Sequence, residues 1–170
     1  VYKRQILDSS RFKTYISKAT GCSQHEIEAM VIGGHGDTTM IPITSLAKCN
    51  NELLTKILSE NQITEIASNT MVGGATLTKL LGTSAWYAPG ASVSYLVSAI
   101  LNDTKEILPC SVLLDGEYGA KDLCIGVPVL IGKDGFEEVV ELDLSNKELE
   151  MFKNSIKAVK ETNSSLIGLI

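Results

Sequence analysis

The segment that most constrains the fold of this chain is residues 107–144, ILPCSVLLDGEYGAKDLCIGVPVLIGKDGFEEVVELDL. It contains three apolar runs separated by Asp-Gly pairs at Asp115-Gly116 and Asp134-Gly135. An Asp-Gly pair between such runs is typical of a turn, and the second pair matches a β-hairpin turn. We therefore predict three antiparallel strands over this part of the chain.

Four segments with helical periodicity surround these strands, over residues 8–21, 59–81, 88–103 and 145–166. Their apolar residues recur every three or four positions, which places them on one face of a helix. The expected buried faces are Phe12, Tyr15, Ile16 and Ala19; Ile63, Ile66, Ala67, Met71 and Leu77; Val93, Leu96, Val97, Ile100 and Leu101; and Leu149, Phe152, Ile156 and Val159. The predicted fold class is α+β, one domain in which antiparallel strands pack against long helices.

Local signals also predict where these helices begin and where they are disturbed. Asp8 or Ser9 can cap the first helix, and Ser145 with Glu148 has the spacing of a capping box for the last. The glycine pair at 73–74 interrupts the second helix, where each glycine costs about 1 kcal/mol relative to alanine. Either another part of the molecule approaches closely there, or the helix has a kink without function.

Charge and cysteine usage exclude some classes of function. The 170 residues carry a net charge of −5 and have no basic stripe, which argues against nucleic-acid binding. The longest apolar runs have only strand length, so no membrane span is expected. The four cysteines lack metal-ligand spacing, so no metal site is predicted. Cys110 and Cys124 are expected to be small buried residues in a reducing cytoplasm.

One of the two histidines, His35, lies in the glycine-rich stretch MVIGGHGDTTMIP directly after an apolar run. The stretch lacks the G-x-G-x-x-G spacing of a dinucleotide-binding loop. His35 could simply be a loop residue that binds backbone, and Asp37 could cap the turn. The functional alternative is proton transfer near neutral pH, for which a histidine needs a carboxylate partner. His25 lies in the polar run CSQHE and is expected to face solvent.

Asp8 and Arg11 supply the side chains that such a histidine would need. They are three residues apart on the first predicted helix and can therefore project from the same side. Asp8 could hold the tautomer of His35, and the guanidinium of Arg11 could bind a substrate carboxylate with two parallel hydrogen bonds. Spacing permits this arrangement but does not establish it.

ILDSSRF, followed after a helix and a strand by VIGGHGDTTMIP, resembles the catalytic domain of the lactate/malate dehydrogenase family. The similarity continues through LLGTSAWYAPGASVSYLVSAIL and the strand region to the last helix, and so covers nearly everything from Ile6 onward. SAWYAPGASV is similar to a segment of bacterial malate dehydrogenases of the lactate-dehydrogenase-like type. Lactate dehydrogenases usually carry glutamate where this chain has Gly34.

The resemblance implies reversible, NAD-dependent oxidation of (S)-malate to oxaloacetate in a cytoplasmic homodimer or homotetramer. It implies that His35 is the acid and base, that Asp8 orients it, and that Arg11 binds the substrate carboxylate. Ser84 and Pro89 match the segment that borders the nicotinamide and the substrate. The alternatives are an L-lactate or other 2-hydroxy-acid dehydrogenase and, from another class, a non-catalytic oligomerisation domain.

The chain departs from the family pattern at its beginning. The family's Rossmann half, with the glycine-rich phosphate loop, is absent from this sequence, so we expect the chain alone to be inactive. The family has a small, glycine-containing stretch where residues 1–5 read VYKRQ. We therefore expect residues 1–5 to be a non-native leader and residues 6–170 to form the catalytic, substrate-binding domain.

Overall fold

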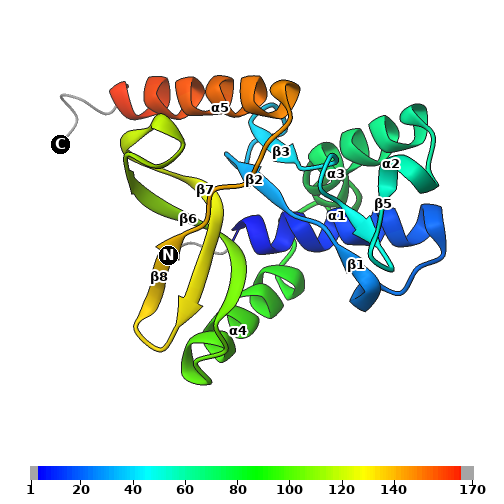
Figure 1. Cartoon of the computed structure of the whole chain (residues 1–170), viewed down its shortest axis with the longest axis horizontal. Coiled ribbons are helices and arrows are strands. Elements are labelled where there is room, and N and C mark those ends of the chain that lie inside the picture. The colour runs from blue at the N-terminus through cyan, green and yellow to red at the C-terminus, as the bar shows by residue number, and fades with distance from the viewer. Residues whose placement is uncertain (1–3, 166–170) are drawn as a thin grey trace.

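The main sheet of the computed structural model, which describes residues 4–165, has five antiparallel strands (Figure 1). The strands are β2 (Val31–Gly33), β3 (Met40–Pro42), β6 (Glu106–Asp115), β7 (Lys121–Gly132) and β8 (Gly135–Val139). β7 pairs with β2, β6 and β8, and β3 pairs with β2. The three strands and the hairpin turn predicted from the two Asp-Gly pairs are confirmed.

Apolar side chains along β6 and β7 build the larger hydrophobic core. The side chains that these strands contribute to the core recur at every second position, because successive side chains of a strand point to opposite faces of the sheet. They are Leu108, Cys110, Val112 and Leu114 on β6, and Leu123, Ile125, Val127, Val129 and Ile131 on β7. Ile32 and Ile41 from β2 and β3 join the same core, so the short hairpin is packed onto the sheet.

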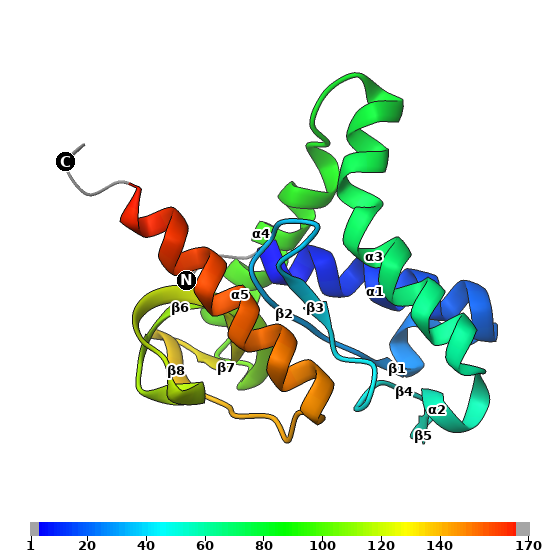
Figure 2. The same ribbon diagram turned by 90° about the horizontal axis from the view of Figure 1, so that it is seen from above.

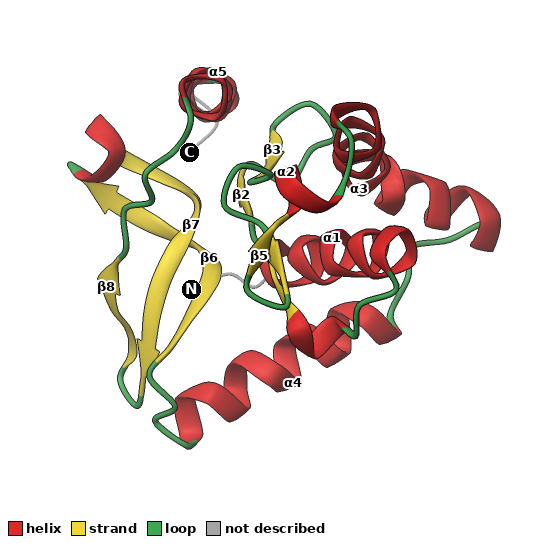
Figure 3. Ribbon diagram, turned by 45° about the vertical axis from the view of Figure 1, so that its right-hand side comes forward, coloured by secondary structure: helices red, strands yellow, loops and turns green. Residues whose placement is uncertain are grey.

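Four long helices surround the sheet, which confirms the predicted α+β architecture. They are α1 (Arg4–Thr20), α3 (Glu60–Leu81), α4 (Tyr87–Leu101) and α5 (Asn146–Ser164). α5 and α4 lie on opposite sides of the molecule in both Figure 1 and Figure 3. Figure 2 shows α3 crossing α1 beside β2 and β3. A second core forms there, with Phe12, Ile16, Val31, Met40 and Ile66 among its buried residues.

A small sheet and several short helices complete the described part of the chain. The small sheet has the order β1 (Ile27–Glu28), β4 (Lys48–Cys49) and β5 (Glu52–Leu53). The short helices are η1 (Gln24–Glu26), α2 (Leu54–Ile57) and η2 (Glu117–Gly119). No helix among residues 4–165 has the length and apolarity needed to cross a membrane.

The cysteines differ in part from expectation. Cys110 is fully buried, and burial raises the pKa of its thiol to about 12. The prediction for Cys124 is wrong, because this residue occupies an outward-facing position of β7 and is exposed. Cys22 and Cys49 form a disulfide that joins the segment after α1 to β4, which the expectation of a reducing compartment did not anticipate.

Helix α1 begins earlier than its sequence signals indicate. It starts at Arg4, so neither Asp8 nor Ser9 caps it, and both side chains lie buried inside the helix. Asp8 fits there because its carboxylate is hydrogen-bonded to Arg11 and His35, as described below. Residues 1–3 of the expected leader lie outside the described residues, whereas Gln5 is buried in the first turn of α1. Whether residues 1–5 are native stays a prediction.

The other helices follow the expected segments but bury partly different faces. The glycine pair at 73–74 does not break α3, which runs continuously from its Ser59 cap. On α4 the buried residues are Ser92, Leu96 and Ala99, and the prediction of buried Val93, Val97 and Leu101 is wrong. These three side chains are exposed because no described part of the chain covers that face of α4. On α5 the buried residues are Glu148, Phe152 and Ser155, whereas Leu149 is exposed.

Hydrogen bonds to Glu148 connect the start of α5 to the segment after β3. The predicted capping box with Ser145 is present, and the Glu148 carboxylate also accepts hydrogen bonds from the backbone N–H and the hydroxyl of Ser45, at 3.1 and 2.5 Å. Burial alone would raise the pKa of Glu148, but the hydrogen bonds from Ser145 and Ser45 outweigh it and lower the pKa below its ordinary value. The ionised carboxylate therefore stabilises the fold.

We expect Glu148→Gln to destabilise the chain at pH 7 by about 1–3 kcal/mol, since the charged acceptor is lost. A carboxyl group whose pKa is lowered by folding stabilises above its unfolded pKa, and that contribution is lost as the pH falls. The difference in unfolding free energy between Glu148→Gln and the unmodified chain should therefore shrink below about pH 4. Urea denaturation at pH 7 and below about pH 4 measures this difference. Glu150→Gln, at an exposed position of the same helix, is the control, and an equal effect of both substitutions would contradict the assignment.

Candidate active site

His35 lies on the loop between β2 and β3, and two glycines shape that loop. Gly33 has φ +86°, and a Cβ added to it would lie 2.6 Å from the carbonyl oxygen of Thr39. A Cβ on Gly34 would lie 2.4 Å from the hydroxyl of Thr39. Glycine is therefore required at both positions, because no larger residue fits where the two sides of the loop approach each other. The space that these glycines leave is filled by the protein itself.

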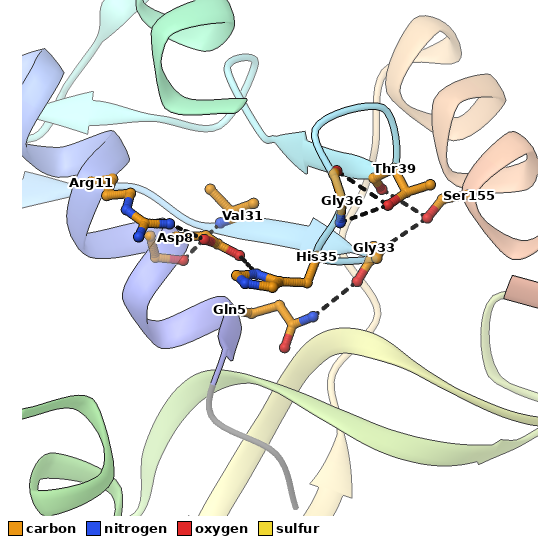
Figure 4. A network of polar contacts seen from close by, with 11 residues as sticks. Gln5, Asp8, Arg11, Val31, Gly33, His35, Gly36, Thr39 and Ser155 are labelled. Atoms are coloured by element: carbon orange, nitrogen blue, oxygen red, sulfur yellow. Dashed lines mark hydrogen bonds and ion pairs between the residues drawn. The ribbon is translucent and has the colours of Figure 1, made fainter. Parts of the chain in front are cut away.

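Asp8 is fully buried, and its carboxylate lies next to the ring of His35 (Figure 4). The His35 ring donates a hydrogen bond from Nδ1 to Asp8 Oδ2 at 2.6 Å. The other oxygen, Oδ1, accepts a hydrogen bond from Arg11 Nη1 at 2.9 Å. A carboxylate can remain charged in the interior when both oxygens are paired in this way. One buried carboxylate thus holds both the imidazole and the guanidinium.

The contact through Nδ1 determines which atom of His35 is available for chemistry. With Nδ1 bound to the carboxylate, Nε2 is the ring atom left to exchange a proton with a ligand. The His35 side chain is 31% exposed, so a ligand can reach it. The arrangement therefore matches a general acid and base that is oriented by a buried carboxylate.

A cavity of about 360 Å³ brings the remaining predicted residues together. Arg11, His35, Ser84 and Pro89 all line it, and Asp8 lies behind its wall. The structure thus places the five predicted residues around one cavity. They come from three parts of the chain that are distant in sequence: α1, the glycine loop, and the region around the start of α4. A cavity of this volume can hold a small organic acid.

Helix α3 packs closely against Arg11 at Gly74. A Cβ on Gly74 would lie 3.2 Å from Arg11 Nη1, whereas one on Gly73 would make an ordinary contact, 3.5 Å from the hydroxyl of Tyr15. The expectation of a close approach is confirmed at Gly74, and the structure does not explain the glycine at 73. Gly74 also lines the cavity. The sequence predicted a close approach at this glycine but not that the approaching group is the guanidinium of Arg11.

Three further side chains that sequence reasoning missed support the loop (Figure 4). Gln5 donates from Nε2 to the carbonyl of Gly33 at 3.1 Å, and the hydroxyl of Thr39 accepts from the N–H of Gly36 at 3.0 Å. Ser155 reaches the loop from α5. No local sequence signal links Ser155 to the loop. As expected, His25 is exposed. Among residues 4–165, no three His, Cys, Asp or Glu side chains are grouped to hold a metal ion.

The model of one protein family matches residues 6–166, and its description is lactate/malate dehydrogenase, alpha/beta C-terminal domain. The chain belongs to the lactate/malate dehydrogenase family. The resemblance noted in the sequence and the fold that it implies are thereby confirmed. The family match and the description of its model place this chain in the C-terminal part of such proteins.

Relatives and solved structures of this family agree with the match. The chain is 59% identical over 160 residues to the malate dehydrogenase of Bacteroides thetaiotaomicron and 56% identical over 164 residues to that of Flavobacterium johnsoniae, covering 51% and 53% of those proteins. It matches the Salinibacter ruber malate dehydrogenase structure with a TM-score of 0.93 and 40% identity, covering 97% of this chain and 54% of that one. The chain thus spans about half the length of the curated relatives it matches.

Proposed function

We propose that this chain is the substrate-binding half of an NAD-dependent malate dehydrogenase, with residues 6–170 as the catalytic domain. The observation that carries the proposal is the 2.6 Å contact between His35 Nδ1 and the buried Asp8, beside Arg11 in one cavity. Relatives that are 56–59% identical are malate dehydrogenases, which supports malate over other 2-hydroxy acids. The expected cytoplasmic location remains part of this proposal.

In the proposed mechanism His35 moves the proton. Its Nε2 donates a proton to the carbonyl oxygen when oxaloacetate is reduced, and accepts the hydroxyl proton when malate is oxidised. Asp8 keeps the other proton on Nδ1 and stabilises the imidazolium, while the ring stays aimed at the substrate oxygen. The buried position of Asp8 strengthens this interaction, because little water screens it.

Arg11 positions the substrate. A guanidinium has five N–H donors, and the contact with Asp8 is one hydrogen bond from Nη1. The remaining donors can bind one substrate carboxylate through two parallel hydrogen bonds. This contact fixes the reacting carbon relative to His35, and such positioning contributes substantially to rate. Asp8 in turn limits the rotation of Arg11.

NAD supplies the hydride acceptor for malate oxidation and, as NADH, the hydride donor for oxaloacetate reduction. The cavity can hold a small dicarboxylate, and Ser84 and Pro89 in its lining would border the nicotinamide. The remainder of the cofactor would bind the nucleotide-binding half. A solved relative, the lactate dehydrogenase of Cryptosporidium parvum, is described as a complex with lactic acid and nicotinamide adenine dinucleotide.

The exposed apolar face of α4 supports assembly into a homodimer or homotetramer. Val93 and Val97 are 45% and 46% exposed, and Leu101 is 79% exposed. Contiguous apolar side chains on a surface are typical of subunit contacts. Assembly accompanies catalysis in this proposal, since a purely structural domain would leave the arrangement of Asp8, Arg11 and His35 unexplained.

The test is substrate choice in the full-length enzyme, by which we mean this half joined to its nucleotide-binding half. We expect NADH-dependent reduction of oxaloacetate with a kcat/KM roughly 10²-fold or more above that for pyruvate. NADH absorbance measures both reactions. A preference for pyruvate would assign the protein as a lactate dehydrogenase, and absence of both reactions would favour the oligomerisation domain.

A further inference from the structure

A side chain from the last helix is bonded to both sides of the loop that carries His35. The hydroxyl of Ser155 donates to the carbonyl oxygen of Thr39 at 2.8 Å and accepts from the N–H of Gly34 at 2.9 Å. The same N–H also reaches the carbonyl of Thr39 directly, at 3.0 Å. Ser155 is only 2% exposed, and its partners Gly34 and Thr39 are at the two ends of the glycine loop. Figure 4 shows Ser155 reaching Thr39 from α5. The hydroxyl therefore closes the base of the loop.

The position of Ser155 follows from how α5 packs. Glu148, Phe152 and Ser155 are the buried residues of this helix, and their spacing of four and three residues places them on one face. Glu148 binds Ser45 beyond β3, whereas Ser155 binds the loop before β3. Helix α5 thus attaches on both sides of β3, and Phe152 on the same helix face joins the core that contains Ile32 and Ile41.

The contact bears directly on His35, because Gly34 is its neighbour in the chain. The imidazole must meet Asp8 on α1, while the backbone that carries it is held from α5. The hydroxyl also occupies the space left by glycine, since a Cβ on Gly33 would lie 3.1 Å from Ser155 Oγ. Without this contact, the loop would keep the direct bond between Gly34 and Thr39, the contacts made by Gln5 and Thr39, the backbone bond from Met40 to Gly36 and the contact between His35 and Asp8, but no link to α5 through Ser155.

We infer that Ser155 is a positioning residue for His35, which fixes the glycine loop so that the imidazole stays aligned with Asp8 and the substrate. The inference rests on the proposed function of His35 as the acid and base. Ser155 does not line the substrate cavity and acts only through the loop backbone. Its loss should therefore lower kcat and leave KM nearly unchanged.

Hydrogen exchange tests whether Ser155 holds the loop. In the full-length enzyme with Ser155→Ala, we expect the amides of residues 34–39 to exchange about tenfold faster than in the unmodified enzyme. The fold should survive, because Gly34 and Thr39 keep their direct hydrogen bond. Ser155→Cys, which keeps the side-chain shape but hydrogen-bonds weakly, is a second variant with an intermediate effect. Mass spectrometry of the peptide that spans the loop measures this.

Steady-state kinetics then tests the consequence for catalysis. We expect Ser155→Ala to lower kcat for oxaloacetate reduction by about 10- to 100-fold, because small misplacements of a reacting group are costly. KM should stay within about twofold of the unmodified value. Two controls accompany it. Ser164→Ala removes an exposed hydroxyl that bonds only within α5, and Glu148→Gln weakens the other attachment of α5 without touching the loop.

The outcomes separate positioning from general stability. Faster exchange of the loop with a lower kcat, in the Ser155 variants alone, supports the inference. Unchanged loop exchange overturns it, as does a kcat within about twofold of the unmodified enzyme. An equal loss of kcat in Glu148→Gln also overturns it, because destabilisation would then suffice. If the unmodified enzyme does not reduce oxaloacetate, the proposed function fails, and exchange alone decides whether Ser155 holds the loop.

Discussion

Replacing His35 with asparagine should lower the kcat of the full-length enzyme by about 10³- to 10⁴-fold, near the upper end of what one acid–base group contributes. Asparagine can still hydrogen-bond Asp8 through its amide, but it cannot exchange a proton with the substrate at neutral pH. The fold should persist, because the side chain is already 31% exposed and contributes little to the core. NADH oxidation with saturating oxaloacetate measures kcat, and thermal unfolding checks the fold.

The chain provides its own matched control for this experiment. His25 is the other histidine, and it is exposed on η1, away from the cavity. His25→Asn should leave kcat within about twofold, as expected for a surface change. If His35→Asn retained more than a tenth of the activity, His35 would not be the acid and base, and the proposed function would fail with it.

Asp8→Asn should lower kcat by about 10²- to 10⁴-fold through the wrong tautomer of His35. The amide has one acceptor and one donor end, whereas Asp8 now accepts from both His35 and Arg11. If the amide oxygen turns to Arg11, its NH₂ group faces His35 and favours the ring with an unprotonated Nδ1. Nε2 then carries the proton in the resting enzyme and cannot accept the proton from malate.

The direction of the reaction is therefore the informative measurement for Asp8→Asn. Malate oxidation, which needs an unprotonated Nε2, should lose at least as much rate as oxaloacetate reduction. Asp143→Asn, at an exposed position outside the cavity, is the matched control. We also expect Asp8→Asn to lower the stability by about 3 kcal/mol, since Arg11 and His35 lose a buried partner. Equal kcat values in both variants would contradict the role of Asp8.

Much of the fold was predictable because its signals are local. The Asp-Gly pairs and the apolar runs that they separate predict β6, β7 and β8 without knowledge of the rest of the molecule. The start of α1 was not predictable in this way, because aspartate and serine are both favoured at helix N-termini. Asp8 lies inside the helix because His35 and Arg11 stabilise its charge, and that stabilisation depends on tertiary structure.

The candidate site shows the same division between local and tertiary information. Asp8, Arg11 and His35 could be nominated because their chemistry is specific and their motifs are distinctive. Ser155 could not, because a serine on an amphipathic helix has no signature until its partners are known. The periodicity of α4 likewise identified an apolar stripe at Val93 and Val97, but periodicity does not say what covers a stripe.

The two oxygens of Asp8 are divided between two different tasks, and this limits how such a site can change over evolution. One oxygen binds the imidazole that would exchange the proton, and the other restrains the guanidinium that would bind the substrate carboxylate. A substitution at position 11 therefore disturbs the acid–base step as well, and the effects of paired substitutions here will not add. New substrate preferences are accordingly easier to acquire elsewhere in the lining of the cavity than at Arg11 itself.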